Sequence, residues 1–206
     1  CSGAETEAAC FDYELVYDVK PGTQTDTKVR LKGKGVPHLR NKNIDVEFPL
    51  PKETKKLIND MLEHLYYSQI EEYSKKYDLR PGMGLAAPQL GINERFFVVC
   101  HEESENKFKN YILINPKMIS HSEELIYASE GEGCLSVNRD VEGIVPRYAR
   151  VTMEAYDMEG RKINVRAREE LAICFQHELD HLNGILFVDH IDKKNPFKDK
   201  DQMRAI

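Results

Sequence analysis

The sequence predicts a single α+β domain in which mixed or antiparallel β-sheets pack around a central metal-binding helix. Helical periodicity is confined to one early and one late stretch, and strand patterns fill most of the sequence between them. No repeat, low-complexity tract or linker divides residues 1–206. A chain of this length is long enough for one domain with a full core. Strands gathered between two separate helices are typical of the α+β class.

The first half of the chain is expected to contain one long helix. Residues 1–30 are small, acidic and irregular, and the pattern assigns no element to them. Residues 48–51 should be extended, because a residue before proline avoids the α region. A helix is then expected over residues 52–77. Its apolar positions recur at helical spacing and are Leu57, Ile58, Met61, Leu62, Leu65, Tyr66, Ile70 and Tyr73.

The second half predicts hairpins followed by a helix. Strands are expected at residues 95–100 and 111–115, with the charged residues 101–109 as the loop between them. Residues 149–156 and 162–165 predict a second hairpin. The late helix begins near residue 168, and Gly184 fits its end. Residues 185–188 then predict a last strand before a charged tail.

Composition excludes several classes of protein. The net charge of -6 offers no general basic surface, so direct DNA binding is not expected. No apolar run approaches the roughly 20 residues of a membrane span, and no signal peptide is recognisable. The odd number of cysteines, without a C-x-x-C pair, argues against a secreted disulfide framework and for the cytoplasm. The first residues, Cys1-Ser2-Gly3, would also fit a processed bacterial lipoprotein. We favour the alternative interpretation, that the chain has been trimmed.

The late helix carries an H-E-x-x-H motif at His177, Glu178 and His181. Residues four apart lie on one face of a helix, so both imidazoles can bind one ion. Glu178 lies about 100° further round the helix, beside the ion, where its carboxylate can take a proton from water. The alternative is an amphipathic helix in which two histidines occur by chance.

A catalytic site of this kind needs a third protein ligand and one open position. The metzincin pattern fails because Phe187 stands where a third histidine is required. Cys174 is separated from His181 by about 10.5 Å of helix rise, too far to share an ion. Cys134, in a glycine-rich loop, is therefore the best candidate. Asp189, His190 and Asp192 are also possible, but no pattern supports them.

Three motifs together resemble the peptide deformylase family. The family patterns G-x-G-L-A-A-x-Q, E-G-C-L-S and Q-H-E-x-D-H match residues 82–89, 132–136 and 176–181, in the family's order and spacing. The resemblance extends from about residue 36 to 197. Three further features resemble the Gram-positive-type subgroup, namely an insert at residues 72–80, the E-G-E-G run at 130–133 and the N-P-F sequence at 195–197.

The resemblance implies a metal-dependent hydrolase that removes the formyl group from the N-terminal formyl-methionine of nascent chains. It implies Cys134, His177 and His181 as ligands of one divalent ion per chain, natively Fe²⁺, with Zn²⁺, Ni²⁺ or Co²⁺ as substitutes. S/N₂ ligation by itself suits zinc as well as iron. The implied partners are formyl-methionyl nascent peptides and, transiently, the ribosome. A cytoplasmic monomer without membrane attachment is expected.

The family mechanism assigns roles to further residues. Glu178 would act as the base, while the Gln89 side chain and the Leu135 backbone N–H would hold the oxyanion. Gly84 would let the substrate lie along the loop as an added strand. The wall for the methionine side chain would comprise Leu135, Ile173 and Cys174.

Arg147 is expected to pair with Asp180 and steady the helix that carries the H-E-x-x-H motif, although an exposed surface arginine is the simpler alternative.

Two rival functions fit the H-E-x-x-H motif. One is a zinc endopeptidase. The other is a binding protein with a purely structural zinc, which would need a fourth protein ligand that the sequence does not offer.

Overall fold

The computed structural model describes residues 39–137 and 141–206, and the backbone of residues 5–10 and 13–18. It divides into two compact units, Cys1–Pro37 and His38–Ile206. In the first unit, β1 (Glu5–Cys10) and β2 (Tyr13–Asp18) form an antiparallel pair. This pair lies within the stretch to which the sequence assigns no element. The extent of one catalytic domain over residues 1–206 stays a prediction.

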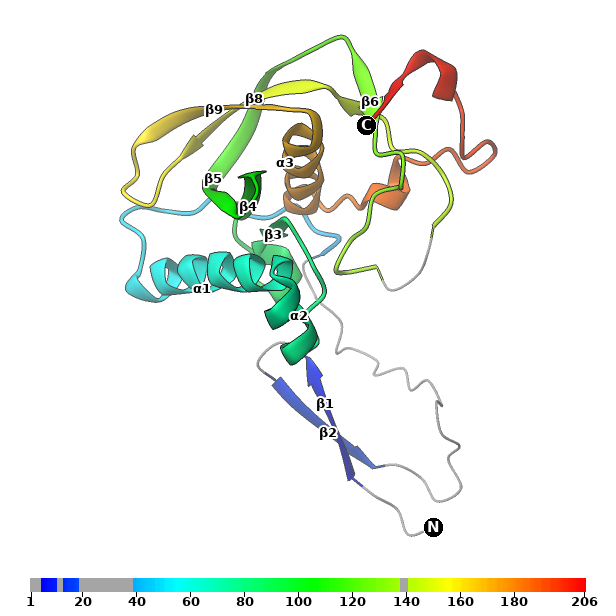
Figure 1. The fold of residues 1–206 in the computed structure, drawn as a ribbon. Coiled ribbons are helices and arrows are strands. Elements are labelled where there is room, and N and C mark those ends of the chain that lie inside the picture. The colour runs from blue at the N-terminus through cyan, green and yellow to red at the C-terminus, as the bar shows by residue number, and fades with distance from the viewer. Residues whose placement is uncertain (1–4, 11–12, 19–38, 138–140) are drawn as a thin grey trace. The chain divides into compact units, whose positions relative to one another are not determined.

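The second unit contains two sheets (Figure 1). The larger one is antiparallel throughout, in the order β3-β4-β5-β8-β9. Its strands are β3 (Gly84–Ala86), β4 (Phe96–Ser104), β5 (Lys107–His121), β8 (Arg150–Tyr156) and β9 (Lys162–Arg168). The smaller sheet has the order β10-β6-β7 and pairs β10 with β6 in parallel. Its strands are β6 (Leu125–Tyr127), β7 (Arg147–Tyr148) and β10 (Arg204–Ala205). The α+β class is confirmed.

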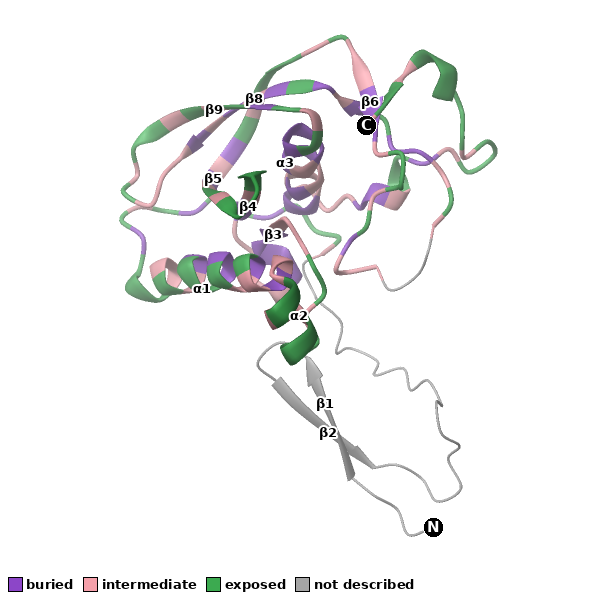
Figure 2. Cartoon of the chain, viewed as in Figure 1, coloured by how far each residue is buried: buried purple, intermediate pink, exposed green. Residues whose placement is uncertain are grey.

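Helices α1 (Lys52–Gln69) and α3 (Glu169–Leu182) cover opposite faces of the larger sheet (Figure 1). Side chains alternate across a strand. In β4, Phe96 and Val98 therefore pack with the apolar side of α1, whereas Phe97 and Val99 pack with α3. Because both faces are covered, β4 begins with five consecutive buried residues. The helix α3 is thus held in the interior, where Figure 2 shows mostly buried positions.

Three expectations about individual elements need correction. The long helix is interrupted at Ile70, whose backbone is extended, so that α2 (Glu71–Tyr77) is a separate helix. The charged stretch 101–109 is mainly strand, and only the turn between Ser104 and Lys107 connects β4 to β5.

The expected last strand is also wrong, because this stretch enters the 3₁₀ helix η2 (Phe187–Asp189). The Asp189 carboxylate accepts the Leu186 N–H at 2.8 Å. This short polar side chain therefore offers the backbone a local bond in place of a sheet partner. The remaining 3₁₀ helices are η1 (Ala87–Leu90) and η3 (Lys200–Gln202).

The end of α3 is held by groups from distant segments. Gly184 has a φ of +76°, as the sequence predicts for a glycine after a helix end, and a Cβ there would meet the Arg40 carbonyl oxygen at 2.6 Å. The buried Arg95 donates to the Leu182 carbonyl at 2.9 Å and to the Asn183 side chain at 3.0 Å. A guanidinium at a helix C-terminus satisfies free carbonyls and complements the helix dipole.

Among the described residues, no helix is both long and apolar enough to cross a bilayer.

Candidate metal centre

Cys134, His177 and His181 come together as the sequence predicts. Their possible ligand atoms all lie within 4.8 Å of one another. Sγ of Cys134 is 3.4 Å from Nε2 of His181, and the centroids of the two imidazole rings are 4.9 Å apart. The two histidines are one turn apart on α3, and the cysteine enters from the loop between β6 and β7. The described part of the chain therefore contains one cluster with the donor set of a mononuclear metal site.

The cysteine lies at the start of a turn. The Val137 N–H donates to the Cys134 carbonyl at 3.1 Å, and the Ser136 N–H donates to the Cys134 sulfur at 3.4 Å. An N–H directed at sulfur stabilises a thiolate. Phe187 stacks on the ring of His177 with a centroid distance of 6.1 Å. The turn thus holds the cysteine sulfur in place, and Phe187 covers one face of the His177 ring.

The donor set fits a divalent cation. A thiol and two imidazoles are ligands of zinc and of other first-row transition metals. Burial and the neighbouring His177 lower the pKa of His181 to about 3, so His181 presents the neutral imidazole that a metal requires. Nδ1 of His177 lies 3.0 Å from the Glu132 carboxylate, which leaves Nε2 of the same ring available to an ion.

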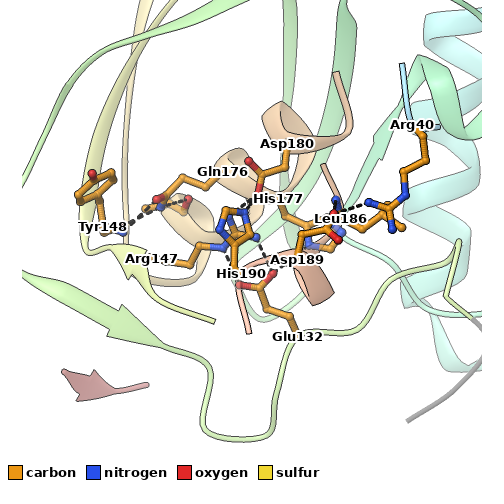
Figure 3. Close-up of polar contacts among 11 residues, drawn as sticks. Arg40, Glu132, Arg147, Tyr148, Gln176, His177, Asp180, Leu186, Asp189 and His190 are labelled. Atoms are coloured by element: carbon orange, nitrogen blue, oxygen red, sulfur yellow. Dashed lines mark hydrogen bonds and ion pairs between the residues drawn. The ribbon is translucent and has the colours of Figure 1, made fainter. Parts of the chain in front are cut away.

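A buried ionic network supports the ligands (Figure 3). Arg147 donates two hydrogen bonds to Glu132, at 2.7 and 2.9 Å, and one to Asp180 at 2.6 Å. Nε2 of His190 lies 2.7 Å from the same oxygen of Asp180. Arg147 therefore joins the partner of His177 to the residue that precedes His181. The predicted pairing of Arg147 with Asp180 is present, and the surface alternative fails because Arg147 is only 3% exposed.

The network holds its groups charged in spite of burial. Burial acts to raise the pKa of Glu132, but the hydrogen bonds from Arg147 and His177 outweigh it and bring the pKa to about 2. Burial likewise opposes ionisation of Asp180, while His190 and Arg147 lower its pKa. Burial lowers the pKa of Arg147, but Glu132 and Asp180 together raise it above its ordinary value. These fixed charges hold the His177 ring in one orientation.

The side-chain amide of Gln176 ties α3 to β7. The side-chain oxygen of Gln176 accepts the Tyr148 N–H at 2.9 Å, and its nitrogen donates to the Tyr148 carbonyl at 3.0 Å. The same nitrogen is 2.8 Å from the Ala172 carbonyl. Because Tyr148 follows Arg147 directly, the Gln176 contacts set the distance between β7 and α3 close to the point where Arg147 reaches Asp180.

Glu178 is buried next to the candidate ligand His177 on α3. It is 3% exposed, and its Oε2 has no hydrogen-bond partner among the described residues. Burial raises the pKa of Glu178 to about 7, against the opposing charge of His177. A Cβ on Gly84 would lie 2.5 Å from Oε1 of Glu178 and 2.8 Å from Sγ of Cys174. The backbone of β3 thus approaches the carboxylate as closely as a glycine permits.

The two residues predicted to hold an oxyanion both line the same cavity. The side-chain oxygen of Gln89 accepts the Ala86 N–H at 2.8 Å, and its nitrogen is 3.3 Å from the Ser136 hydroxyl. This bonding sets the orientation of the amide, with its N–H donors towards the cysteine loop. Leu135 follows Cys134 directly in that loop.

The cavity has a volume of about 760 Å³. Eight of the predicted site residues line it, whereas the candidate ligand His181 does not; the eight are Gly84, Gln89, Cys134, Leu135, Ile173, Cys174, His177 and Glu178. Burial, with the nearby Glu178, raises the pKa of Cys174 well above its ordinary value, as suits an inert apolar wall. Arg147 and Asp180 do not line the cavity.

Sequence reasoning misses two members of the site. From the sequence, Glu132 is recognised only as part of a motif and has no predicted role of its own, although its position two residues before Cys134 places it in the same loop as that candidate ligand. His190 is predicted only as a possible third metal ligand, yet it contacts Asp180 instead. The two aspartates weighed as third ligands, Asp189 and Asp192, are not part of the cluster; they accept the N–H groups of Leu186 and Lys194.

Two mainly antiparallel sheets around a helix that presents H-E-x-x-H to a loop cysteine define a metal-dependent hydrolase. The sequence pattern of the family Polypeptide deformylase matches residues 30–197. The chain therefore belongs to the peptide deformylase family, whose members remove the N-formyl group from nascent peptides and depend on a metal ion.

Similar proteins include bacterial relatives that cover most of this chain. Peptide deformylase 2 of Bacillus subtilis is 48% identical over 172 residues, which are 84% of this chain and 94% of the relative. The peptide deformylase of Macrococcus caseolyticus is 51% identical over 80% of this chain and 90% of its own length. The crystal structure of peptide deformylase from Thermus thermophilus matches with a TM-score of 0.63 and 35% identity, covering 78% of this chain and 83% of that one. The resemblance to the Gram-positive members is thereby confirmed.

Proposed function

We propose that this enzyme deformylates the N-terminal formyl-methionine of newly made polypeptides, with Cys134, His177 and His181 holding one divalent metal ion and Glu178 acting as the base. The observation that carries this proposal is the buried Glu178 carboxylate, which lies against the ligand cluster inside the cavity and has one oxygen without a hydrogen-bond partner among the described residues. Such an arrangement supplies a proton acceptor where a water would enter.

The bound ion would lower the pKa of a water and polarise the formyl oxygen. One thiolate and two imidazoles would leave it an open position, as in catalytic sites. We propose Fe²⁺ as the native metal, with Zn²⁺, Ni²⁺ or Co²⁺ as functional substitutes, because the donor set accommodates each of them. No fourth protein ligand joins the cluster in the described part of the chain, which argues against a purely structural zinc site.

Glu178 would move the protons of the reaction. With a pKa raised to about 7 it can accept a proton from the attacking water near neutral pH, and it can then pass that proton to the leaving amine. As water adds to the formyl carbon and the C–N bond breaks, the products are formate and a free amine. Gly84 and Cys174 confine the carboxylate, so that it stays aligned with the cavity.

The negative charge that develops on the formyl oxygen needs donors in fixed positions. Gln89 is suited to this role because its oxygen accepts the Ala86 N–H, and its nitrogen has a second N–H available besides the one directed at the Ser136 hydroxyl. We assign the backbone N–H of Leu135 as the second donor, since the turn at Cys134 brings it to the cavity.

Strand β3 offers an edge for the substrate backbone. In the larger sheet, β3 is the first strand in the order and, among the described strands, pairs only with β4. An extended peptide can therefore add to its free side at Gly84, as in recognition by strand addition. The apolar residues Leu135, Ile173 and Cys174 line the adjacent cavity and would receive an unbranched methionine side chain.

We place the reaction in the cytoplasm, in a monomeric enzyme that meets nascent chains and contacts the ribosome transiently. The side chains of Cys100, Cys134 and Cys174 are free thiols, which fits a reducing compartment.

The decisive experiment compares formate release from formyl-Met-Ala-Ser with cleavage of acetyl-Met-Ala-Ser and of a longer unformylated peptide. We expect rapid release from the formyl substrate and slower release from a formyl-Leu analogue, with little or no cleavage of the others. A formyl group carries only hydrogen on its carbonyl carbon and fits where an acetyl methyl would clash. Equal rates on formyl and acetyl peptides, or internal cleavage, would establish an endopeptidase instead.

A further inference from the structure

Strand β10 brings a side chain to the candidate active site from far along the chain. It lies parallel to β6, with Arg204 opposite Ile126. The alignment continues beyond the strand, because the Ile206 N–H donates to the Tyr127 carbonyl at 3.0 Å and the Ser129 N–H donates to the Ile206 carbonyl at 2.9 Å. Both the N–H and the carbonyl of Ile206 are therefore hydrogen-bonded to the segment that continues β6. In Figure 1 this end of the chain lies beside β6.

Ile206 forms part of an apolar surface that faces the cavity. Its side chain packs on the cluster of Ile126, Ala149 and Ile173, and it lines the cavity together with Ile173. Ile173 precedes the metal ligand His177 by four residues, which is about 6 Å of helix rise. Ile206 and Ile173 thus belong to one apolar part of the cavity wall. This position is suited to the end of a long substrate side chain rather than to the formyl group.

Arg204 ties this wall to the metal helix. Its guanidinium donates two hydrogen bonds to Glu169, both 2.8 Å, and one to Glu124 at 2.9 Å. Glu169 is the first residue of α3 and has a φ of +53°, which is unusual for a side chain other than glycine. The planar guanidinium matches the carboxylate with a two-point contact that a lysine could not make. β10 and the beginning of α3 are thereby linked directly.

We propose that Ile206 is a specificity-determining residue, which contacts the end of the methionine side chain, and that Arg204 is the positioning residue that holds it there. The inference rests on the proposed deformylase function and adds β10 to the substrate site. A methionine side chain is long enough to pass Cys174 and Ile173 and reach this wall, whereas an alanine side chain ends at Cβ and does not. Ile206 should therefore affect the two substrates differently.

The test compares formyl-Met-Ala-Ser with formyl-Ala-Ala-Ser for the parent enzyme and for Ile206→Ala, as a double-mutant cycle between enzyme and substrate. We expect the preference for methionine, expressed as the ratio of kcat/KM values, to fall by about ten-fold, the scale for lost methylene contacts in an apolar pocket. The rate on the alanine substrate should be unchanged within about two-fold. Ile206→Val should lose less. Ile119→Ala is the matched control, since Ile119 is 52% exposed on β5.

Arg204→Met should shift the preference in the same direction by raising KM for the methionine substrate at unchanged kcat, and Arg204→Lys should recover part of the loss. Arg161→Met, at an exposed arginine paired with Asp157 in a distant turn, is its control. Equal losses on both substrates in Ile206→Ala and Ile206→Val would show a merely structural role and overturn the inference, even if Ile206→Ala folds poorly. A parent enzyme that releases no formate from either peptide would overturn the proposed function instead.

Discussion

Substitution of Gly84 by alanine tests the close approach between β3 and the candidate base. The new Cβ would lie 2.5 Å from Oε1 of Glu178 and 2.8 Å from Sγ of Cys174, whereas ordinary contact begins at 3.4 Å. Glu178 is 3% exposed and has little room to retreat. Either the carboxylate or the strand must therefore move by about 1 Å, a displacement that can cost about 10²-fold in rate.

We accordingly expect Gly84→Ala to lower kcat for formyl-Met-Ala-Ser by about 10²-fold, which corresponds to about 2.7 kcal/mol of transition-state stabilisation. Bound metal should remain near one ion per chain, because none of the three nearest atoms belongs to Cys134, His177 or His181. The measurements are formate release, metal content by mass spectrometry and the thermal unfolding midpoint.

Gly82→Ala is the matched control on the same segment. The three atoms nearest to its Cβ would be Cδ1 and Cγ of Leu135, at 3.3 and 3.8 Å, and Cδ2 of Leu65 at 3.7 Å, and the end of a leucine side chain can shift by a few tenths of an ångström. The loss in Gly82→Ala should be about ten-fold smaller than that in Gly84→Ala. If both variants were equally active, Glu178 would not be confined by β3, and the reasoning from close approach would be refuted.

The remaining predictions concern the metal centre and its buried network. Cys134→Ala should reduce bound metal well below one per chain, while Cys174→Ala should leave it unchanged; equal contents would remove Cys134 from the ligand set. Glu178→Ala should retain metal and fold but lose about 10²–10⁴ in kcat, and Gln89→Leu should lose about 10²–10³; near-parental kinetics would contradict either role. Arg147→Met leaves the buried Glu132 and Asp180 without their shared partner, so denaturant unfolding should show a loss of about 3–5 kcal/mol, whereas Arg150→Met, which breaks an exposed pair, should change stability by no more than about 1 kcal/mol. In the metal-free protein, the pKa of Glu132 is about 2 in the folded state against an ordinary value of 4.5. Its contribution of about 3 kcal/mol to the free energy of unfolding is therefore fully present above pH 4.5 and is lost as the pH falls towards 2. Glu132→Gln should weaken this pH dependence of the free energy of unfolding below pH 4.5, and an unchanged dependence would refute the assignment.

Local periodicity accounts for most of what could be predicted about the fold. The β4 run and the alternation in β8 are correct as strands, because apolar spacing reflects which faces are buried. The errors occur where spacing carries no such information. The break at Ile70 and the turn of η2 depend on local hydrogen bonds, including the Asp189 carboxylate at Leu186, that apolar spacing does not encode.

The sequence by itself determined the part of the site that depends on one helix. Helix geometry predicts that His177 and His181 face one point, because four residues make about one turn. It also predicts that Cys174 and His181 are too far apart to share an ion and that Glu178 lies beside the site. Elimination made Cys134 the best candidate for the third ligand and the motif comparison implied the same residue, whose sulfur does lie within 4.8 Å of the candidate ligand atoms of both histidines. These conclusions required no knowledge of how distant segments pack.

Only the tertiary structure decided which groups surround those ligands. Glu132 reaches His177 across 45 residues, Arg147 reaches Asp180 across 33, and Arg204 reaches Glu169 across 35. Contacts at such separations depend on sheet order and strand register, which no local pattern encodes. The orientation of His177 and the wall at Ile206 are consequences of that topology, because the energy of a buried charge or an apolar contact depends on what the fold places next to it.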